Sequence, residues 1–210
     1  ANYREVARHT YDDRVKSFPF FCFGPVEPLW IMLTCKFESL NPLNKTKKCF
    51  WGNGAAGSFV VGSRPDIPMH VQEAIAYDRD RFVQNSLVAE NVAMGGKLSH
   101  EDFINNLRSH RSFLVLNGSG KVHRRFFEGV TADSLAIVEK NDVIQPAEVD
   151  LVWKKEKRCE FENCEELVQL VRRVNADDSL YIDLLKNQQD YRSTILTKNW
   201  LGKYIENALI

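Results

Sequence analysis

The sequence has no excess of charge of either sign. Its 210 residues include 28 Lys and Arg and 28 Asp and Glu, so the formal net charge at pH 7 is zero. Proteins that bind polyanions through their overall charge usually carry a clear basic excess. The balance therefore argues against a nucleic-acid-binding protein.

Long hydrophobic runs are also missing. No apolar stretch approaches the roughly 18 residues that a membrane-spanning helix needs. The richest stretch, residues 18–35, is interrupted by Pro19, Pro25, Glu27 and Pro28. We therefore expect no membrane span. A hydrophobic content of 44% and a charged content of 27% predict a folded globular protein rather than a disordered chain.

Cysteine is sparse and follows no ligand or redox pattern. The five cysteines form no CxxC pair, and their odd number leaves at least one thiol free within the chain. A disulfide framework is not expected at this size, which favours a cytoplasmic location over the alternative, the lumen of the secretory pathway. The chain begins Ala-Asn-Tyr-Arg, without an initiator Met or a signal segment, so we expect a processed chain or a piece of a longer one.

The pattern of the chain changes near residue 46. Residues 1–45 hold four of the seven prolines and an aromatic cluster at residues 18–30, and form an N-terminal Pro- and aromatic-rich segment. Apolar runs that predict strands follow at residues 48–51, 85–90, 112–116, 135–138 and 149–153. Helical spacing predicts helices at residues 68–77, from Ser99 onward, and at 122–132, 164–174, 179–191 and 196–208.

This alternation predicts an α/β fold for residues 46–210. We expect a mostly parallel, Rossmann-like sheet flanked by helices, with C-terminal helices after it. Ligands of such sheets bind at the carboxyl ends of strands, near helix N-termini. The loops at residues 52–57, 117–121 and 139–143 are therefore the places to look for a site.

The loop after the strand at residues 112–116 is the first candidate. It consists of Asn117, Gly118, Ser119 and Gly120. Its glycines allow a ligand to approach the backbone, and the helix that follows offers unpaired N–H groups. Arg124 or Arg125 could bind a phosphate, Glu128 could reach a ribose or base, and His123 could transfer a proton or contact phosphate. A plain turn with solvated charges explains the same residues equally well.

Two further motifs are weaker. Gly52, Asn53 and Gly54 form a predicted turn after a strand and stand in G-x-G-x-x-G register with Gly57, but the residues after them look extended rather than helical. Asp78 and Asp80 form an Asp-x-Asp motif that could hold Mn²⁺ or Mg²⁺ beneath a diphosphate. Pairing of these carboxylates with the neighbouring arginines on a solvated surface is the favoured interpretation.

The second half of the chain carries a family resemblance. Its residues are the strand Phe113-Leu-Val-Leu116, the loop at 117–120, Arg125-Phe-Phe-Glu128, the run at 129–140, and Phe161-Glu-Asn-Cys-Glu-Glu-Leu-Val-Gln-Leu-Val171. From Ser112 to its end the sequence resembles the C-terminal, donor-binding half of GT-B glycosyltransferases, and looks closest to exostosin-like and related enzymes.

The resemblance implies transfer of a sugar from a nucleotide-diphosphate sugar to a glycan or glycoprotein acceptor. Arg125 would contact the diphosphate and Glu128 the ribose, while Glu139 and Lys140 would lie near the donor's sugar or phosphate. No metal cofactor would be required, and no residue is assigned as the catalytic base.

The sequence departs from the family pattern in three places. The usual Gly after the small helix is replaced by Asp133-Ser134, and the acid expected eight residues before Glu128 falls on Gly120. A GT-B enzyme also has two Rossmann-like halves, and 210 residues hold little more than one. Either the second domain lies on another segment or on a partner, or the fold is a reduced one.

Two alternatives remain open. One is a metal-dependent GT-A-type glycosyltransferase in which Asp78 and Asp80 hold Mn²⁺ or Mg²⁺. The other is a non-catalytic α/β module that binds a nucleotide, or binds a protein partner through the aromatic N-terminal segment.

Overall fold

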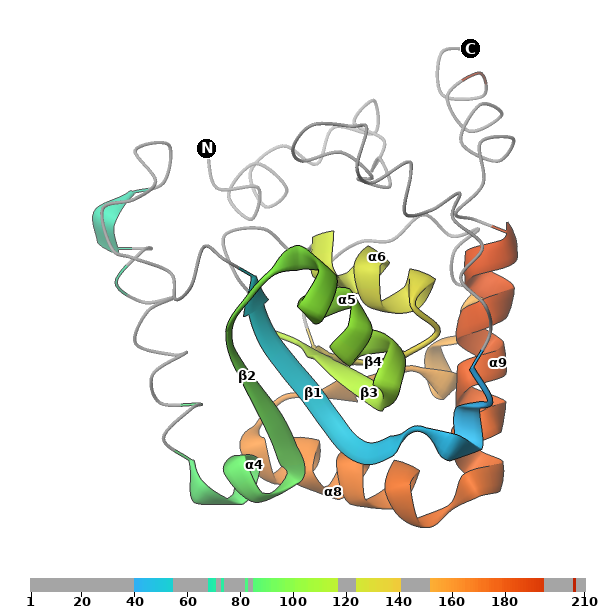
Figure 1. Ribbon diagram of the computed structural model, residues 1–210. Coiled ribbons are helices and arrows are strands. Elements are labelled where there is room, and N and C mark those ends of the chain that lie inside the picture. The colour runs from blue at the N-terminus through green and yellow to red at the C-terminus, as the bar shows by residue number, and fades with distance from the viewer. Residues whose placement is uncertain are drawn as a thin grey trace.

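The structure is a computed structural model, and its described residues build a helix-flanked sheet (Figure 1). It describes residues 40–54, 68–70, 73, 82, 85–116, 124–140, 152–194 and 206. The strands are β1 (Thr46–Gly54), β2 (Val92–Leu98), β3 (His110–Val115), β4 (Leu135–Glu139) and β5 (Cys159–Phe161). The helices are α4 (Ser86–Asn91), α5 (His100–Ser109), α6 (Arg124–Thr131), α8 (Cys164–Ala176) and α9 (Asp178–Thr194), with short 3₁₀ turns η1 (Pro42–Asn44) and η2 (Lys155–Lys157).

The five strands form one parallel sheet in the order β2-β1-β3-β4-β5. The chain passes from β1 outward to β2, then crosses back over β1 to β3 and continues to β4 and β5. This is the 2-1-3-4-5 order of doubly wound, flavodoxin-like sheets, whose winding direction reverses between β1 and β3. The predicted α/β fold with a mostly parallel, helix-flanked sheet is confirmed.

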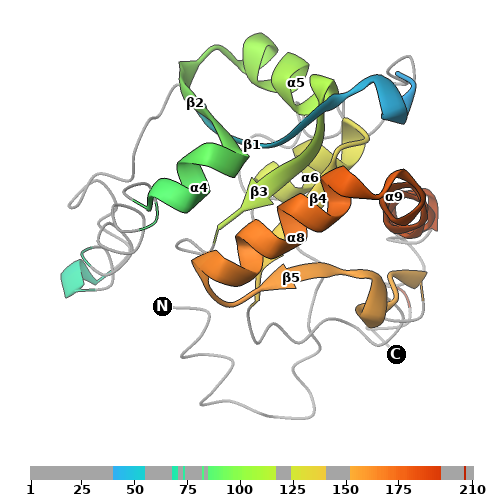
Figure 2. The ribbon, with the colours of Figure 1, turned by 90° about the horizontal axis from the view of Figure 1, so that it is seen from below.

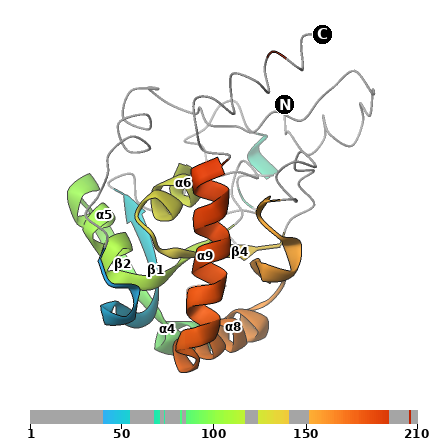
Figure 3. The same cartoon turned by 90° about the vertical axis from the view of Figure 1, so that its right-hand side faces the viewer.

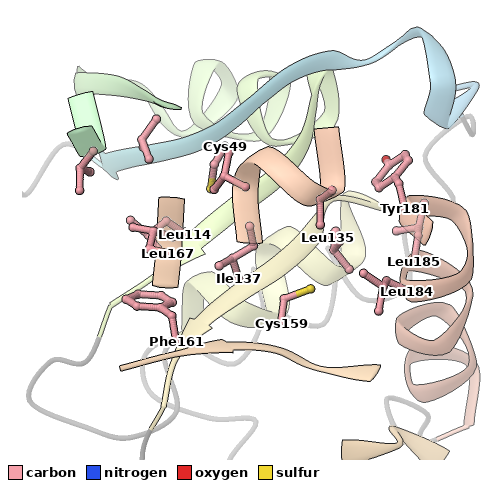
Figure 4. Close-up of a cluster of buried hydrophobic side chains, with 14 of the residues drawn as sticks. Cys49, Leu114, Leu135, Ile137, Cys159, Phe161, Leu167, Tyr181, Leu184 and Leu185 are labelled. Carbon is pink, nitrogen blue, oxygen red and sulfur yellow. The ribbon is translucent and has the colours of Figure 1, made fainter. Parts of the chain in front are cut away.

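Helices cover both faces of the sheet. Along β3, Phe113 and Val115 join the core beneath α5 and α6, whereas Leu114 joins the opposite core beneath α4 and α8. Figure 2 shows α4 and α8 in front of the strands, and Figure 4 shows the side chains of this second core. Strands buried on both faces are apolar without interruption, which is why residues 112–116 and 135–138 predicted strands correctly.

Helix α9 lies across the amino-terminal ends of the strands, between α6 and α8 (Figure 3). Its Gln188 amide donates to the Ser134 carbonyl at 2.7 Å and accepts from the Ala136 N–H at 2.7 Å. Gln188 thus satisfies the backbone at the start of β4. Tyr191 enters the core under α6 while Tyr181 enters the opposite core, so α9 ties the two layers together.

Two helix starts follow from capping side chains. The Ser99 hydroxyl accepts from the Asp102 N–H at 3.1 Å and donates to its carboxylate at 2.7 Å, and this capping pair begins α5, the helix predicted from Ser99 onward. Residues 85–90 were expected to form a strand, and that prediction is wrong. The Asn85 side chain accepts from the N–H groups of Leu87 and Val88 and begins α4. The strand lies later, as β2.

The predicted turn at Gly52, Asn53 and Gly54 is also wrong, because all three belong to β1. Gly52 pairs with Gly95 of β2, and the Phe50 ring lies against both glycines. A Cβ atom would fall 2.4 Å from that ring at Gly52 and 2.9 Å from it at Gly95. The glycines therefore make room for a ring on the sheet.

The last strand lies later than residues 149–153. Val152 and Trp153, the described residues of that range, are not in a strand, whereas Cys159 pairs with Ile137 to place β5 beside β4. Helices α8 and α9 confirm those predicted at residues 164–174 and 179–191. The boundary between residues 45 and 46 stays a prediction, as does the helix at 196–208, of which Glu206 alone is described.

None of the helices in the described part of the chain combines the length and apolar character that crossing a bilayer requires.

Candidate functional site

The carboxyl ends of the strands form the edge of the sheet opposite α9 (Figure 2). Strands β1 and β3 are direct neighbours there, and the winding of the chain reverses between them. The loops that follow two such strands run to opposite faces of the sheet, and this opens a crevice between them. The crevice is the usual ligand site of doubly wound sheets. The described chain reaches this edge at Gly54, Leu116 and Lys140.

Helix α6 begins at the same edge. The chain leaves the carboxyl end of β3 and must return to the amino end of β4, so α6 runs antiparallel to the strands. Its N-terminus, with unpaired N–H groups and positive dipole charge, is therefore directed toward the carboxyl edge. Arg124 and Arg125 are its first two residues, and their side chains lie outside the described part.

Close packing on β3 fixes the position of α6. A Cβ atom at Gly129 would lie 2.2 to 2.4 Å from three atoms of the Phe113 ring, so the helix backbone rests directly on that ring. Phe126 and Phe127 on either side of the contact are buried in the same core. The helix is thereby held at one height against the sheet, which sets the position of Glu128.

Glu128 is the one Asp or Glu of the described residues that is buried, with only 4% of its surface exposed. Burial of a carboxylate is tolerated where hydrogen bonds or opposite charges compensate it, and Glu128 takes part in such an interaction within the protein. Glu128 is the fifth of the eight residues of α6, about one turn from the helix N-terminus that is directed toward the carboxyl edge. A carboxylate there accepts hydrogen bonds only, so it suits a ligand that offers hydroxyl groups.

The end of β4 supplies an exposed cation. The Lys140 N–H donates to the Phe161 carbonyl at 2.7 Å, which continues the pairing of β4 with β5 beyond Glu139. The Lys140 ammonium forms an ion pair with the Glu162 carboxylate. The hydrogen bond to Glu162 is the main reason that the pKa of Lys140 is raised.

The other predicted site residues are placed as follows. Gly52 is a buried strand residue, and Asn53 and Gly54 end β1 at the candidate edge. The remaining residues lie outside the described part: Asn117, Gly118, Ser119, Gly120, His123, Asp78 and Asp80. Within the described ranges, no three His, Cys, Asp or Glu side chains gather as metal ligands.

The sequence analysis missed a polar cluster at the opposite, amino-terminal edge. Arg111, 1% exposed, donates to the Asp178 carboxylate at 2.6 Å and lies over the Tyr181 ring. Lys45 is also buried and donates to the Asp133 carbonyl at 2.6 Å. Burial lowers the pKa of Lys45 to about 8. These contacts join α9 and the residues before β1 to the sheet, so we assign the cluster a structural role.

One signal could have revealed this cluster. Arg111 is the single charge in the otherwise apolar or small strand at residues 111–116, where it must find a partner when buried. Its partner Asp178 is 67 positions away, so no local pattern indicates which residue pairs with Arg111.

The turn after α6 explains one departure from the family pattern. The Ser134 N–H donates to the Gly129 carbonyl at 3.0 Å and the Asp133 N–H to the Val130 carbonyl at 3.3 Å, which together form a Schellman motif. Asp133 has a φ of 54°, the left-handed conformation that Gly normally adopts in this motif. Asp133 is held there through its carboxylate, which accepts from Arg192 at 2.9 Å.

No known family model, curated protein sequence or solved structure matches the chain significantly.

Proposed function

We propose that this chain is the nucleotide-sugar-binding half of a GT-B-type glycosyltransferase. The observation that carries the proposal is the buried carboxylate of Glu128 on α6, the helix that follows β3, which is one of the two strands at the reversal point. A ribose offers neighbouring hydroxyl groups to such a carboxylate. A diphosphate attached to that ribose can then receive the N–H groups of the helix end.

The turn at Asp133 adds support. The family resemblance calls for Gly after this helix, and the chain needs a left-handed residue at that position. Asp is among the few non-Gly residues that adopt this conformation at small cost. Asp133 therefore departs from the family pattern in residue type only, because its backbone has the conformation that Gly would adopt.

Each residue has a chemical role in the proposal. Glu128 holds the ribose, while Arg125 and the N-terminus of α6 bind the diphosphate. Negative charge builds up on the nucleoside diphosphate as the bond to the sugar breaks, and fixed cations and N–H dipoles at that point lower the barrier. The acceptor and the catalytic base would come from a second domain, and sugar transfer would need no metal ion.

The proposal is tested by isothermal titration of the chain with UDP, GDP, ADP and CMP, each with and without Mn²⁺. We expect one nucleotide to bind without metal. Glu128→Gln should then weaken the binding of that nucleotide by about 10- to 100-fold. This range corresponds to a loss of about 1.5–3 kcal/mol, which is typical of hydrogen bonds to a charged group. Glu156→Gln, an exposed carboxylate in η2 near the opposite edge, serves as the control and should leave the affinity unchanged.

The other outcomes are equally informative. Binding that requires Mn²⁺ and is lost in Asp80→Asn would replace the proposal with the metal-dependent alternative. Binding that is equal in wild type and Glu128→Gln would remove the observation on which the proposal rests. Metal-free nucleotide binding without donor hydrolysis or sugar transfer, even when an acceptor domain is supplied, would identify a non-catalytic module.

A further inference from the structure

The Lys140–Glu162 ion pair stands at the carboxyl edge, next to the proposed diphosphate position. Lys140 follows β4 directly, and β4 is the neighbour of β3, from which the chain leads to α6. The two side chains are 53% and 57% exposed, so solvent and an incoming ligand can reach both. Of the basic side chains that the structure describes, Lys140 alone follows the carboxyl end of a strand.

The backbone on both sides of the pair is fixed. Lys140 is held by its N–H donation to Phe161. The Glu162 N–H donates to the Glu166 carboxylate at 2.8 Å, and the Asn163 side chain accepts from the Glu166 N–H at 2.9 Å, which forms a reciprocal cap at the start of α8. A change of partner at Lys140 therefore requires only that side chains rotate.

The surroundings of Lys140 are acidic. Glu160, Glu162 and Glu166 all act on its ammonium and raise its pKa. In the free protein the positive charge of Lys140 is thus compensated by carboxylates of the chain itself. An anionic ligand gains the full attraction of Lys140 only after the ammonium has left Glu162.

We propose that Glu162 is a specificity-determining residue that competes with the diphosphate for Lys140. The inference rests on the proposed function. Lys140 exchanges Glu162 for the ligand's phosphate when the ligand binds. A diphosphate attracts Lys140 more strongly than a monophosphate does and therefore loses more of that attraction to the competing carboxylate, so Glu162 narrows the preference of the site for diphosphates over monophosphates.

The exchange is tested with UDP and UMP, or with the corresponding pair for the base that binds, by titration of Glu162→Gln, Lys140→Gln and the double variant. Glu165→Gln is the matched control, because it removes the same charge from the first turn of α8 at an exposed position. Since exposed ion pairs are weak, we expect Glu162→Gln to tighten the binding of UDP about five-fold and that of UMP about three-fold. Glu165→Gln should have a smaller effect, and Lys140→Gln should weaken UDP about ten-fold.

The double variant separates exchange from general repulsion. If Glu162 acts by competing for Lys140, Glu162→Gln has no effect in the Lys140→Gln background. An equal gain in both backgrounds, or an equal gain from Glu165→Gln, would overturn the exchange. Normal UDP binding that depends on Glu128 but not on Glu162 would refute this inference alone. Absence of nucleotide binding in the wild type would refute the proposed function and this inference with it.

Discussion

Asp133 shows how a single residue preserves a backbone that its own type does not favour. Its left-handed conformation is stabilised by Lys45, which donates to its carbonyl, and by Arg192, which donates to its carboxylate. These contacts tie the end of α6 to the segment before β1 and to α9. The turn that returns the chain from the candidate site to β4 is thereby anchored from two directions.

Replacement of Asp133 tests this conformation. Asp133→Ala and Asp133→Gly both lose the carboxylate, but Ala also incurs the left-handed penalty of about 1–2 kcal/mol. We expect the free energy of unfolding in urea to be lower for Asp133→Ala than for Asp133→Gly by about 1 kcal/mol. At Asp190, an exposed position within α9, the order should invert, because Ala is the better helix former by about 1 kcal/mol. The same order at both positions would contradict the assigned turn.

Cysteine illustrates a residue whose burial removes its chemistry. Cys49 and Cys159 are buried strand residues, and burial raises the pKa of each thiol to about 12. The thiolate is the reactive form, so both thiols are protonated and inert near neutral pH. They fill space in the core beneath α4 and α8 (Figure 4).

The contact between α6 and β3 is the element-scale feature on which the candidate site depends. Gly129 allows the helix to rest on the Phe113 ring, and this contact sets the height of the helix N-terminus and of Glu128 above the sheet. A side chain at Gly129 would lift or tilt α6. Such a movement would change both the stability of the fold and the geometry of the candidate site.

Gly129→Ala should therefore destabilise the protein. In a helix interior, replacement of Gly by Ala ordinarily raises the free energy of unfolding by about 0.5–1 kcal/mol. Here overpacking against the ring should lower the free energy of unfolding in urea by about 2–3 kcal/mol. Phe113→Leu removes the ring, so the double variant Phe113→Leu, Gly129→Ala should be more stable than the sum of the single effects by at least about 1 kcal/mol. A stabilising Gly129→Ala would show that the helix does not rest on the ring.

The sheet shows what local sequence can predict and what it cannot. Strands β3 and β4 were recognisable because burial on both faces leaves residues 113–115 and 135–138 apolar. Strand β5 has three residues with Glu160 in the middle, and β2 contains two glycines, so neither shows the usual pattern. Residues 85–90 are apolar enough to resemble a strand, but the cap at Asn85 begins a helix there.

At the scale of the whole molecule, strand order is what the sequence could not provide. Alternating strands and helices predicted a parallel sheet, but pairing of β1 with both β2 and β3 depends on contacts between segments far apart in the chain. Only that order places the reversal point between β1 and β3 and makes β4 the neighbour of β3, whereas parallel pairing alone places Lys140 and the N-terminus of α6 at the same edge. The structural cluster around Arg111 was missed for the same reason, since its partners lie on distant segments.

We expect a nucleoside diphosphate to bind at the carboxyl edge of the sheet. The most direct test maps amide chemical-shift changes in the ¹⁵N-labelled chain on titration with UDP, or with whichever nucleoside diphosphate binds. We predict the largest changes at Gly54, Leu116, Arg125 and Lys140, and none at the amino-terminal edge around Arg111. Changes that gather around Arg111 while the carboxyl edge stays silent would contradict the account.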